Sequence, residues 1–330
     1  MPEFRILVIR LSSMGDVIHT LPAAASLKHS FPHSSVSWIV RKRWTPLLQG
    51  NPFVNRVISV EGGLQGLIRS WRAARRECFD LVVDFQGLIQ SALVAASVRS
   101  QKKVGLHRSQ ARESLASLFY STAVLTREAH RVERNLELAA AAGATSLLRV
   151  FPLPEGEPEG DLPDGQFVLA CPFAGWGAKQ WPLEHFAEVA RGLEIPLVLN
   201  GPPGSAASLA RAGAHVHTSG LAGLIHATRR ASAVIGLDSG PLHLAAALSK
   251  PGVAIYGPSD PAVHGPYGGT IRVLRAPDAT TSQKRRSRED PSMLAIRPSQ
   301  VLEALREALN SDGLKPSSSK HPTMRAGFTA

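Results

Sequence analysis

The feature that most constrains the fold of this chain is the stretch from residue 233 to residue 257. Residues 233–237 are a short apolar run, typical of a buried strand, and the run breaks at residues 238–240. Pro241 then stands at the first position of a predicted helix, where its missing N–H costs nothing. Residues 252–257 supply a further apolar strand. The stretch is therefore one strand–turn–helix–strand unit, the building block of a parallel sheet.

The turn of this unit is a candidate anion site. It follows the C-terminal end of a strand and lies under a helix N-terminus, where backbone N–H groups and the helix dipole favour a phosphate. Open α/β sheets also bind their ligands at this edge. A plain βα turn that uses Gly240 for tightness is the alternative. The hydroxyl of Ser239 and the imidazole of His243 favour the anion site.

Length and cysteine content limit the classes of protein to which the chain can belong. Its 330 residues predict two domains, each large enough for its own core. The sequence shows no apolar run that could span a bilayer and no signal-like segment at its N-terminus. Cys78 and Cys171 lie far apart and fit neither a disulfide framework nor a metal site. These features predict a cytoplasmic protein.

The net charge of +11 predicts anionic partners. Nucleic acid, an acidic membrane surface and phosphorylated small molecules all fit this charge. A solvated basic surface without a function is the alternative. Aromatic residues are only 6% of the chain, and the basic motifs of known nucleic-acid-binding modules are missing, so a non-catalytic nucleic-acid or nucleotide binder is a remote alternative and we expect no nucleic-acid partner.

The chain repeats one architecture twice without repeating its sequence. Strand-like runs alternate with helical stretches up to about residue 143, and the pattern restarts at residue 167 after a segment rich in Pro, Gly, Asp and Glu. We predict an α/β fold of two Rossmann-like domains that face a central cleft, with residues 1–155 in the first domain, residues 156–310 in the second and a disordered tail at 311–330. Neither a Gly-x-Gly-x-x-Gly fingerprint nor a Walker A loop occurs in the sequence, which argues against a nicotinamide-dependent dehydrogenase and a P-loop enzyme.

Three turns at predicted strand ends could carry chemistry, at residues 12–16, 172–181 and 238–243. Lys179 could neutralise a diphosphate leaving group, although a surface lysine is the alternative. Asp16 could act as a general base toward a hydroxyl, although it could instead cap the following helix. The sequence holds no Asp-x-Asp pair, His-Glu-x-x-His or Cys-x-x-Cys, so a metal ion at the diphosphate is not favoured. Together these residues predict group transfer from a nucleotide-diphosphate donor.

The same segments resemble glycosyltransferase family 9, and in particular its branch that adds the first heptose to the lipopolysaccharide core. The run Ser12-Ser13-Met14-Gly15-Asp16 through Ala23 resembles the N-terminal signature of that branch. Further segments resemble it in the same order, and together they cover about residues 4–310: 83–88, 108–120, 179–182, 238–243 and 256–261.

This resemblance implies a GT-B fold and an inverting, metal-independent transfer that needs no cofactor. L-glycero-D-manno-heptose would move from ADP-heptose to the first 3-deoxy-D-manno-octulosonic acid (Kdo) residue of the lipid A inner core. Asp16 would be the general base. The donor would be bound by Lys179, Asp238, Ser239, Gly240, His243, Ala174, Gly175 and Ser219. The anionic acceptor would be bound by Arg69, Arg72, Arg108, Arg112 and Arg134. The resemblance also implies a monomer at the inner face of the inner membrane, whose last helix packs back on the first domain.

The chain departs from the family pattern at two places in the donor site. Ala174 and Gly175 stand where the family usually has hydroxyl side chains, and the family's donor-binding Glu falls near Ala206. A family member that uses another nucleotide-sugar, or that adds a later heptose, is therefore the alternative function.

Overall fold

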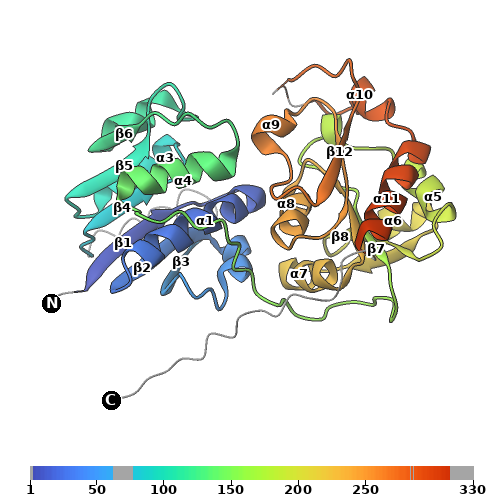
Figure 1. Cartoon of the computed structure of the whole chain (residues 1–330), viewed down its shortest axis with the longest axis horizontal. Helices are drawn as coiled ribbons and strands as arrows, with labels where there is room; N and C mark the ends of the chain where they lie inside the picture. The colour runs from blue at the N-terminus through green and yellow to red at the C-terminus, as the bar shows by residue number, and fades with distance from the viewer. Residues whose placement is uncertain (1–2, 62–76, 283, 285, 313–330) are drawn as a thin grey trace.

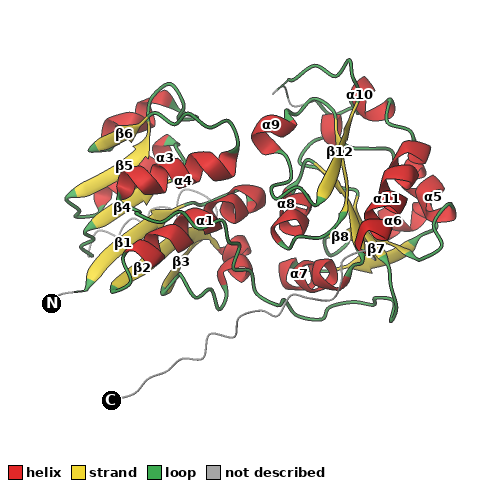
Figure 2. Cartoon of the chain, viewed as in Figure 1, coloured by secondary structure: helices red, strands yellow, loops and turns green. Residues whose placement is uncertain are grey.

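A computed structural model of the chain describes residues 3–61, 77–282, 284 and 286–312. The predicted acceptor residues Arg69 and Arg72, and most of the predicted tail, lie outside the described residues. The chain forms two α/β units side by side, each with helices packed on a parallel sheet (Figures 1 and 2). The predicted fold class is confirmed.

The first unit is built on a six-stranded parallel sheet with the strand order β3-β2-β1-β4-β5-β6. Its strands are β1 (Phe4–Ile9), β2 (Ser34–Arg41), β3 (Arg56–Val60), β4 (Leu81–Asp84), β5 (Lys102–Leu106) and β6 (Thr122–Val124). Its helices are α1 (Met14–Ser30), α3 (Ile89–Ser97) and α4 (Arg131–Ala142), with 3-10 helices η1 (Lys42–Leu48) and η2 (Ser114–Phe119). Strands β1 and β4 are almost wholly buried apolar runs, as expected of central strands covered on both faces.

The second unit has a sheet with the order β12-β11-β10-β7-β8-β9, also parallel. Its strands are β7 (Val168–Cys171), β8 (Leu197–Gly201), β9 (His215–Thr218), β10 (Ala233–Leu237), β11 (Gly252–Tyr256) and β12 (Ile271–Arg275). Its α-helices are α5 (Leu183–Arg191), α6 (Ala206–Leu209), α7 (Leu221–Arg230), α8 (Gly240–Ala247), α9 (Pro261–His264), α10 (Pro291–Leu294) and α11 (Pro298–Asp312). The 3-10 helices η3 (Gly177–Lys179) and η4 (Ala210–Ala212) complete it.

Both sheets have the same order when the strands of each are numbered from the first, namely 3-2-1-4-5-6. This is the doubly wound order, in which the crossovers leave in opposite directions from strands 1 and 4 and open a crevice between them. In the first unit that crevice lies after β1 and β4, and in the second after β7 and β10. The three predicted turns follow β1, β7 and β10, so the topology places all of them at switch points.

The two units pack on each other through α1 and α8 (Figure 1). One apolar core cluster is continuous across this contact, because it includes Ile18 and Leu21 of α1 as well as Leu242 and Leu244 of α8. Both helices begin next to a predicted turn. The packing therefore brings the ligand edges of the two sheets together.

The structure corrects the predicted position of the last helix. Helix α11 packs on α5 and on strands β11, β12 and β10 of the second unit, not on the first unit (Figure 1). Its buried side chains Val301, Ala304 and Leu305 join the core of the second unit, so its apolar face is already covered there. Four strands were not predicted from the sequence: β5 carries two Lys and β9 two His side chains, β6 has only three residues, and β12 has Arg at its second and fifth positions.

The connection between the units supports the predicted domain boundary, which we retain as a proposal at residues 155–156. The carbonyl of Pro152 accepts a hydrogen bond from Asn51 of the first unit at 2.9 Å. Two residues later, the carbonyl of Pro154 accepts one from Arg229 of α7 in the second unit, also at 2.9 Å. The carboxylate of Glu159 then accepts from the backbone N–H groups at the start of α7.

Candidate active site

The first part of the site is the turn between β1 and α1, which holds the carboxylate of Asp16. Helix α1 begins at Met14, and Asp16 lies in its first turn. The backbone N–H and the hydroxyl of Ser13 donate to Asp16 Oδ2 at 2.9 and 2.8 Å, which forms a capping box. Arg10, itself buried, pairs with the other oxygen, Oδ1. Asp16 therefore does cap the helix, and its carboxylate also carries an ion pair.

These contacts keep Asp16 ionised. Burial raises the pKa of Asp16, but the Arg10 guanidinium and the hydrogen bonds from Ser13 outweigh it and hold that pKa well below its usual range. The carboxylate is about 29% exposed, so it remains within reach of a ligand. A partly open carboxylate that is charged at every physiological pH can accept a hydrogen bond from a hydroxyl.

Strand β4 fixes the shape of this turn. Gln86 Oε1 accepts from the backbone N–H groups of Leu11 and Ser12 at 2.9 and 3.2 Å. Gln86 is in turn placed by the buried Asp84, which accepts from the Gln86 N–H at 2.8 Å and from the Tyr120 hydroxyl at 2.8 Å. The segment at 83–88 that resembles family 9 therefore supports the Asp16 turn and does not itself bear an exposed reactive group.

The second part of the site joins the turn after β7 to the turn after β10. Lys179 forms a hydrogen-bonded ion pair with Asp238, and its ammonium lies 4.2 Å from the ring centre of Trp176. Burial raises the pKa of Asp238, but the contacts with His243 and Lys179 lower it by more. The pKa of Asp238 is therefore well below its usual range. Both side chains are largely buried, with 15% and 9% exposed. Two of the predicted donor residues thus touch directly.

The other predicted donor residues occupy the turns that follow β7, β9 and β10. The hydroxyl of Ser239 is buried and has no hydrogen-bond partner in the structure, and Gly240 begins helix α8. A Cβ at Gly175 would meet nothing within 4 Å, so its loop is open there, whereas Ala174 packs against the core of the second unit. Ser219 is buried and accepts from Asn200 at 3.0 Å. A hydroxyl without a partner at a helix N-terminus is a group that could donate a hydrogen bond to an anion.

Histidines join the two parts across the interface. His19 Nε2 of α1 and His243 Nδ1 of α8 are 3.2 Å apart. His243 Nε2 lies 3.8 Å from Asp238 Oδ1. A second link runs from His130 Nε2, just before α4, to the carbonyl of Gly265 at 3.1 Å. Buried histidines therefore connect α1 of the first unit to the Asp238 carboxylate of the second.

Arginines gather on the first-unit side of the site. Arg134 donates to Thr126 at 3.1 Å, while its Nη2 and the Nε of Arg131 are buried without a hydrogen-bond partner. Burial lowers the pKa of Arg131. The charge of Asp16 raises this pKa, and the charges of three other arginines lower it: Arg10, Arg134 and Arg112. All of these charges therefore lie near Arg131. Arg131 was not among the predicted acceptor residues, although it stands one turn of helix before Arg134, on the same side of α4. Arg108 and Arg112 lie in the exposed loop after β5.

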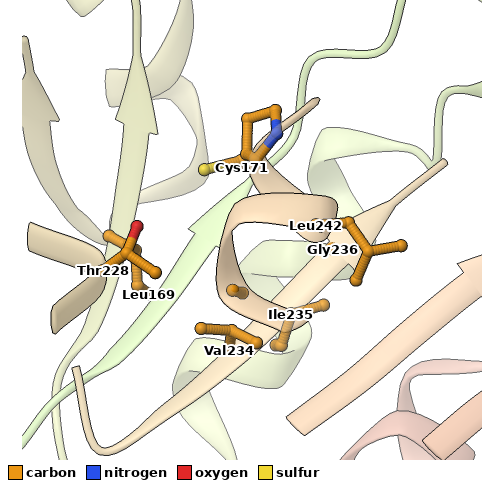
Figure 3. Close-up of a pocket in the computed structure, with 9 residues that line it drawn as sticks. Leu169, Cys171, Thr228, Val234, Ile235, Gly236 and Leu242 are labelled. Atoms are coloured by element: carbon orange, nitrogen blue, oxygen red, sulfur yellow. The ribbon is translucent and has the colours of Figure 1, made fainter. Parts of the chain in front are cut away.

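A cavity behind α8 is too small to hold a nucleotide-sugar. It lies between α8 and the strands β7 and β10, has a volume of about 10 Å³ and is lined mostly by apolar side chains, among them Leu169, Val234 and Leu242 (Figure 3). This is room for at most one water molecule. Burial raises the pKa of Cys171, which lines it, to about 12, so this thiol stays protonated. In the part of the chain that the structure describes, no group of three His, Cys, Asp or Glu side chains could hold a metal ion.

The contact between α1 and α8 depends on two glycines. A Cβ at Gly15 would lie 2.4 Å from His243 Cδ2, and a Cβ at Gly240 would lie 2.6 Å from Met14 Sδ. We expect Gly15→Ala to separate the two helices, to cost about 1–3 kcal/mol of stability and to lower turnover. Small-angle scattering should show a larger radius of gyration. Gly165→Ala, where a Cβ meets nothing within 4 Å, is the matched control. Equal scattering and turnover for both variants would contradict this account.

His19, which is buried, and His130 and His264, which are half-buried, predict an acid-sensitive fold. Burial lowers the pKa of His264 to about 4, and it also lowers the pKa values of His19 and His130. These imidazoles are neutral in the folded chain, whereas in the unfolded chain they bind protons below a pKa of about 6.5. The free energy of unfolding is therefore at its full value above a pH of about 6.5 and decreases as the pH falls toward 4. Each histidine then costs at most about 1.4 kcal/mol per pH unit. Urea unfolding at several pH values measures the slope of the free energy of unfolding against pH. We expect His264→Gln to reduce this slope and the control His33→Gln, at an exposed position, to leave it unchanged. Equal slopes would contradict the prediction.

Comparison with known proteins agrees with this geometry. The family model for glycosyltransferase family 9 (heptosyltransferase) matches residues 67–293. Lipopolysaccharide heptosyltransferase 1 of Escherichia coli is 32% identical over 313 residues, covering 83% of this chain and 94% of that protein. The enzyme of the same name from Pseudomonas aeruginosa is 34% identical over 299 residues, covering 80% and 81%. The solved structure of Escherichia coli heptosyltransferase WaaC with ADP superimposes with a TM-score of 0.76 at 28% identity, covering 92% of this chain and 100% of that one.

Two Rossmann-like units that meet at their ligand edges define an enzyme of the GT-B type. The chain belongs to glycosyltransferase family 9, the heptosyltransferase family. The predicted fold and the predicted enzyme class are confirmed. The roles assigned to individual side chains remain predictions.

Proposed function

We propose that this chain is an inverting, metal-independent transferase that moves L-glycero-D-manno-heptose from ADP-heptose to the first Kdo residue of the lipid A inner core. The main support for the proposal is that a turn with a carboxylate and turns with a lysine lie at the interface between the two units. The first unit presents a charged carboxylate among arginines, and the second presents a lysine beside a helix N-terminus. The names of its relatives support the reaction, and the solved structures of one relative with ADP and with ADP-2-deoxy-2-fluoro heptose support the donor.

In the proposed reaction, Asp16 accepts the proton of the acceptor hydroxyl while that oxygen forms its bond to the anomeric carbon. The bond between this carbon and the diphosphate oxygen breaks, and ADP leaves from the opposite face, which inverts the anomeric configuration. The acceptor hydroxyl becomes acidic only as its new bond forms, so a carboxylate of low pKa suffices if it accepts the proton late. Lys179 and the N–H groups at the start of α8 neutralise the departing diphosphate.

The arginines give the acceptor side its selectivity in this proposal. Lipid A carries phosphates and Kdo carries a carboxylate, and both are anions that guanidinium groups bind in a planar, two-point geometry. Arg108, Arg112 and Arg134 would bind them, together with Arg131, whose Nε has no other partner. Arg69 and Arg72 remain proposed acceptor residues outside the described part of the chain. We further propose that the protein works as a monomer in the cytoplasm, peripherally bound to the inner membrane.

A different nucleotide-sugar donor is the second candidate, and the donor loops favour it. Gly175 is exposed where a hydroxyl side chain is usual, and Ala206 begins α6 as an exposed methyl where the family carboxylate is expected. A panel of nucleotide-sugars tests the two candidates. The main proposal predicts turnover with ADP-heptose above that with every other donor and a product of inverted anomeric configuration. Turnover with another sugar and none with ADP-heptose would support the second candidate instead.

A further inference from the structure

One face of the first unit exposes large apolar side chains beside the acceptor loop. Leu115 and Leu118 of η2 are 58% and 76% exposed, and Leu93 of α3 is 45% exposed. In a 3-10 helix the side chains at i and i+3 lie on the same side, so both leucines of η2 point the same way, while Ala116 is fully buried. Helices α3 and η2 pack on each other. We call Leu93, Leu115 and Leu118 the leucine face.

The leucine face is tied to the catalytic turn by short connections. The acceptor loop at 107–113 leaves β5 at the ligand edge of the sheet and runs directly into η2. The N–H of Glu113, the residue before η2, donates to the carbonyl of Gly87 at 3.1 Å. Gly87 follows Gln86, whose side chain holds the Asp16 turn. Whatever contacts the leucine face is therefore held at a fixed position relative to Asp16.

The charges around this face suit an anionic partner. Arg108 and Arg112 are exposed in the loop that leads to η2. The acidic residue of this segment, Glu113, accepts from the N–H of Ile89 at 2.6 Å, so its charge is engaged at the start of α3. Exposed leucines next to exposed arginines match the interface of an anionic bilayer, where apolar side chains enter the acyl boundary and cations meet the lipid headgroups. No helix in the described ranges is long and apolar enough to cross a bilayer.

We propose that the leucine face inserts into the surface of an anionic membrane and so places the Asp16 turn at the level of the headgroups. The consequence for catalysis rests on the proposed function, because it requires an acceptor whose acyl chains stay in the bilayer while its sugar reaches Asp16. Membrane binding itself does not depend on which sugar is transferred. The arginines alone would give a loose, salt-sensitive association, whereas the leucines fix the depth and orientation of the first unit.

Vesicle binding by the full-length chain tests this proposal without donor or acceptor. Vesicles of phosphatidylcholine with phosphatidylglycerol serve as the anionic probe, and pure phosphatidylcholine vesicles serve as the neutral one. We expect Leu115→Ser/Leu118→Ser to lower the partition coefficient on anionic vesicles by at least about tenfold. Leu294→Ser, at a leucine of the second unit that is 48% exposed, is the matched control and should bind like the wild type. The single variant Leu118→Ser provides a test should the double variant unfold.

Turnover on a soluble acceptor and on a vesicle-bound acceptor distinguishes a failure of the membrane proposal from a failure of the proposed function. The double variant should use a deacylated, soluble acceptor as well as the wild type does and should be slow only on an acylated acceptor in vesicles. Failure of the wild type to bind anionic vesicles, unchanged binding by the double variant, or an equal loss in Leu294→Ser would overturn the proposal. So would a wild-type dimer that the double variant converts to a monomer in sedimentation, since the leucine face would then join two copies of the chain.

Discussion

Asp16→Asn should lower kcat by roughly 10²- to 10⁴-fold and leave donor affinity unchanged. The amide cannot accept the proton of the acceptor hydroxyl, but its oxygen can still accept the hydrogen bonds from Ser13 that cap α1. Donor binding depends on the second unit, so calorimetric titration with ADP should give the wild-type affinity. The measurement is steady-state turnover at saturating donor.

A control variant separates the base from the helix cap. Ser13→Ala removes one of the hydrogen bonds to Asp16 and keeps the carboxylate, its Arg10 partner and the backbone donor. We expect this variant to lose about 0.5–2 kcal/mol of stability and to keep most of its turnover. Near-normal turnover in Asp16→Asn, or an equal loss in Ser13→Ala, would remove Asp16 from the chemical step.

Lys179→Ala should weaken donor binding by roughly 10- to 100-fold, because a charge-assisted contact to the diphosphate is lost. It should also lower kcat, since the charge that develops on the departing ADP is no longer neutralised. The variant leaves the buried carboxylate of Asp238 without its ammonium partner, next to the imidazole of His243, so its melting temperature should fall as well. Titration with ADP and steady-state kinetics below the melting temperature measure the first two effects.

The ion pair also predicts non-additive effects. Asp238→Asn in the Lys179→Ala background should recover stability, because no buried charge is then left unpaired, but it should not recover donor affinity. Lys179→Arg keeps the charge and should retain part of the binding. Unchanged kinetics in Lys179→Ala would make this residue a structural partner of Asp238 and nothing more.

The sequence predicted well what local chemistry decides. The apolar run at 233–237, its break and the helix after it predicted the strand, turn and helix that bear Asp238 and His243. The turn at Asp16 was placed correctly, but whether Asp16 caps a helix or faces a ligand could not be decided from spacing. The structure shows that one carboxylate does the first and remains open enough for the second.

Long-range packing decided the parts that sequence analysis missed. Nothing local in α1 or α8 indicates that Gly15 and Gly240 allow two helices from different units to touch. The ion pair of Lys179 with Asp238 joins residues 59 positions apart, and the contact of His19 with His243 joins residues 224 apart. The amphipathic pattern of the last helix showed which of its sides is apolar, but not which sheet would cover it.

The most direct test of the account is a transfer assay with ADP-heptose and a deacylated Kdo-lipid A acceptor, run without added metal and again with a chelator. The proposed mechanism predicts heptosylated product with inverted anomeric configuration at equal rates in both reactions, and loss of this product in Asp16→Asn. Absence of product from a chain that still binds ADP would contradict the proposed sugar or acceptor. Loss of product only with chelator would contradict a mechanism in which Lys179 and the start of α8 neutralise the diphosphate without a metal ion.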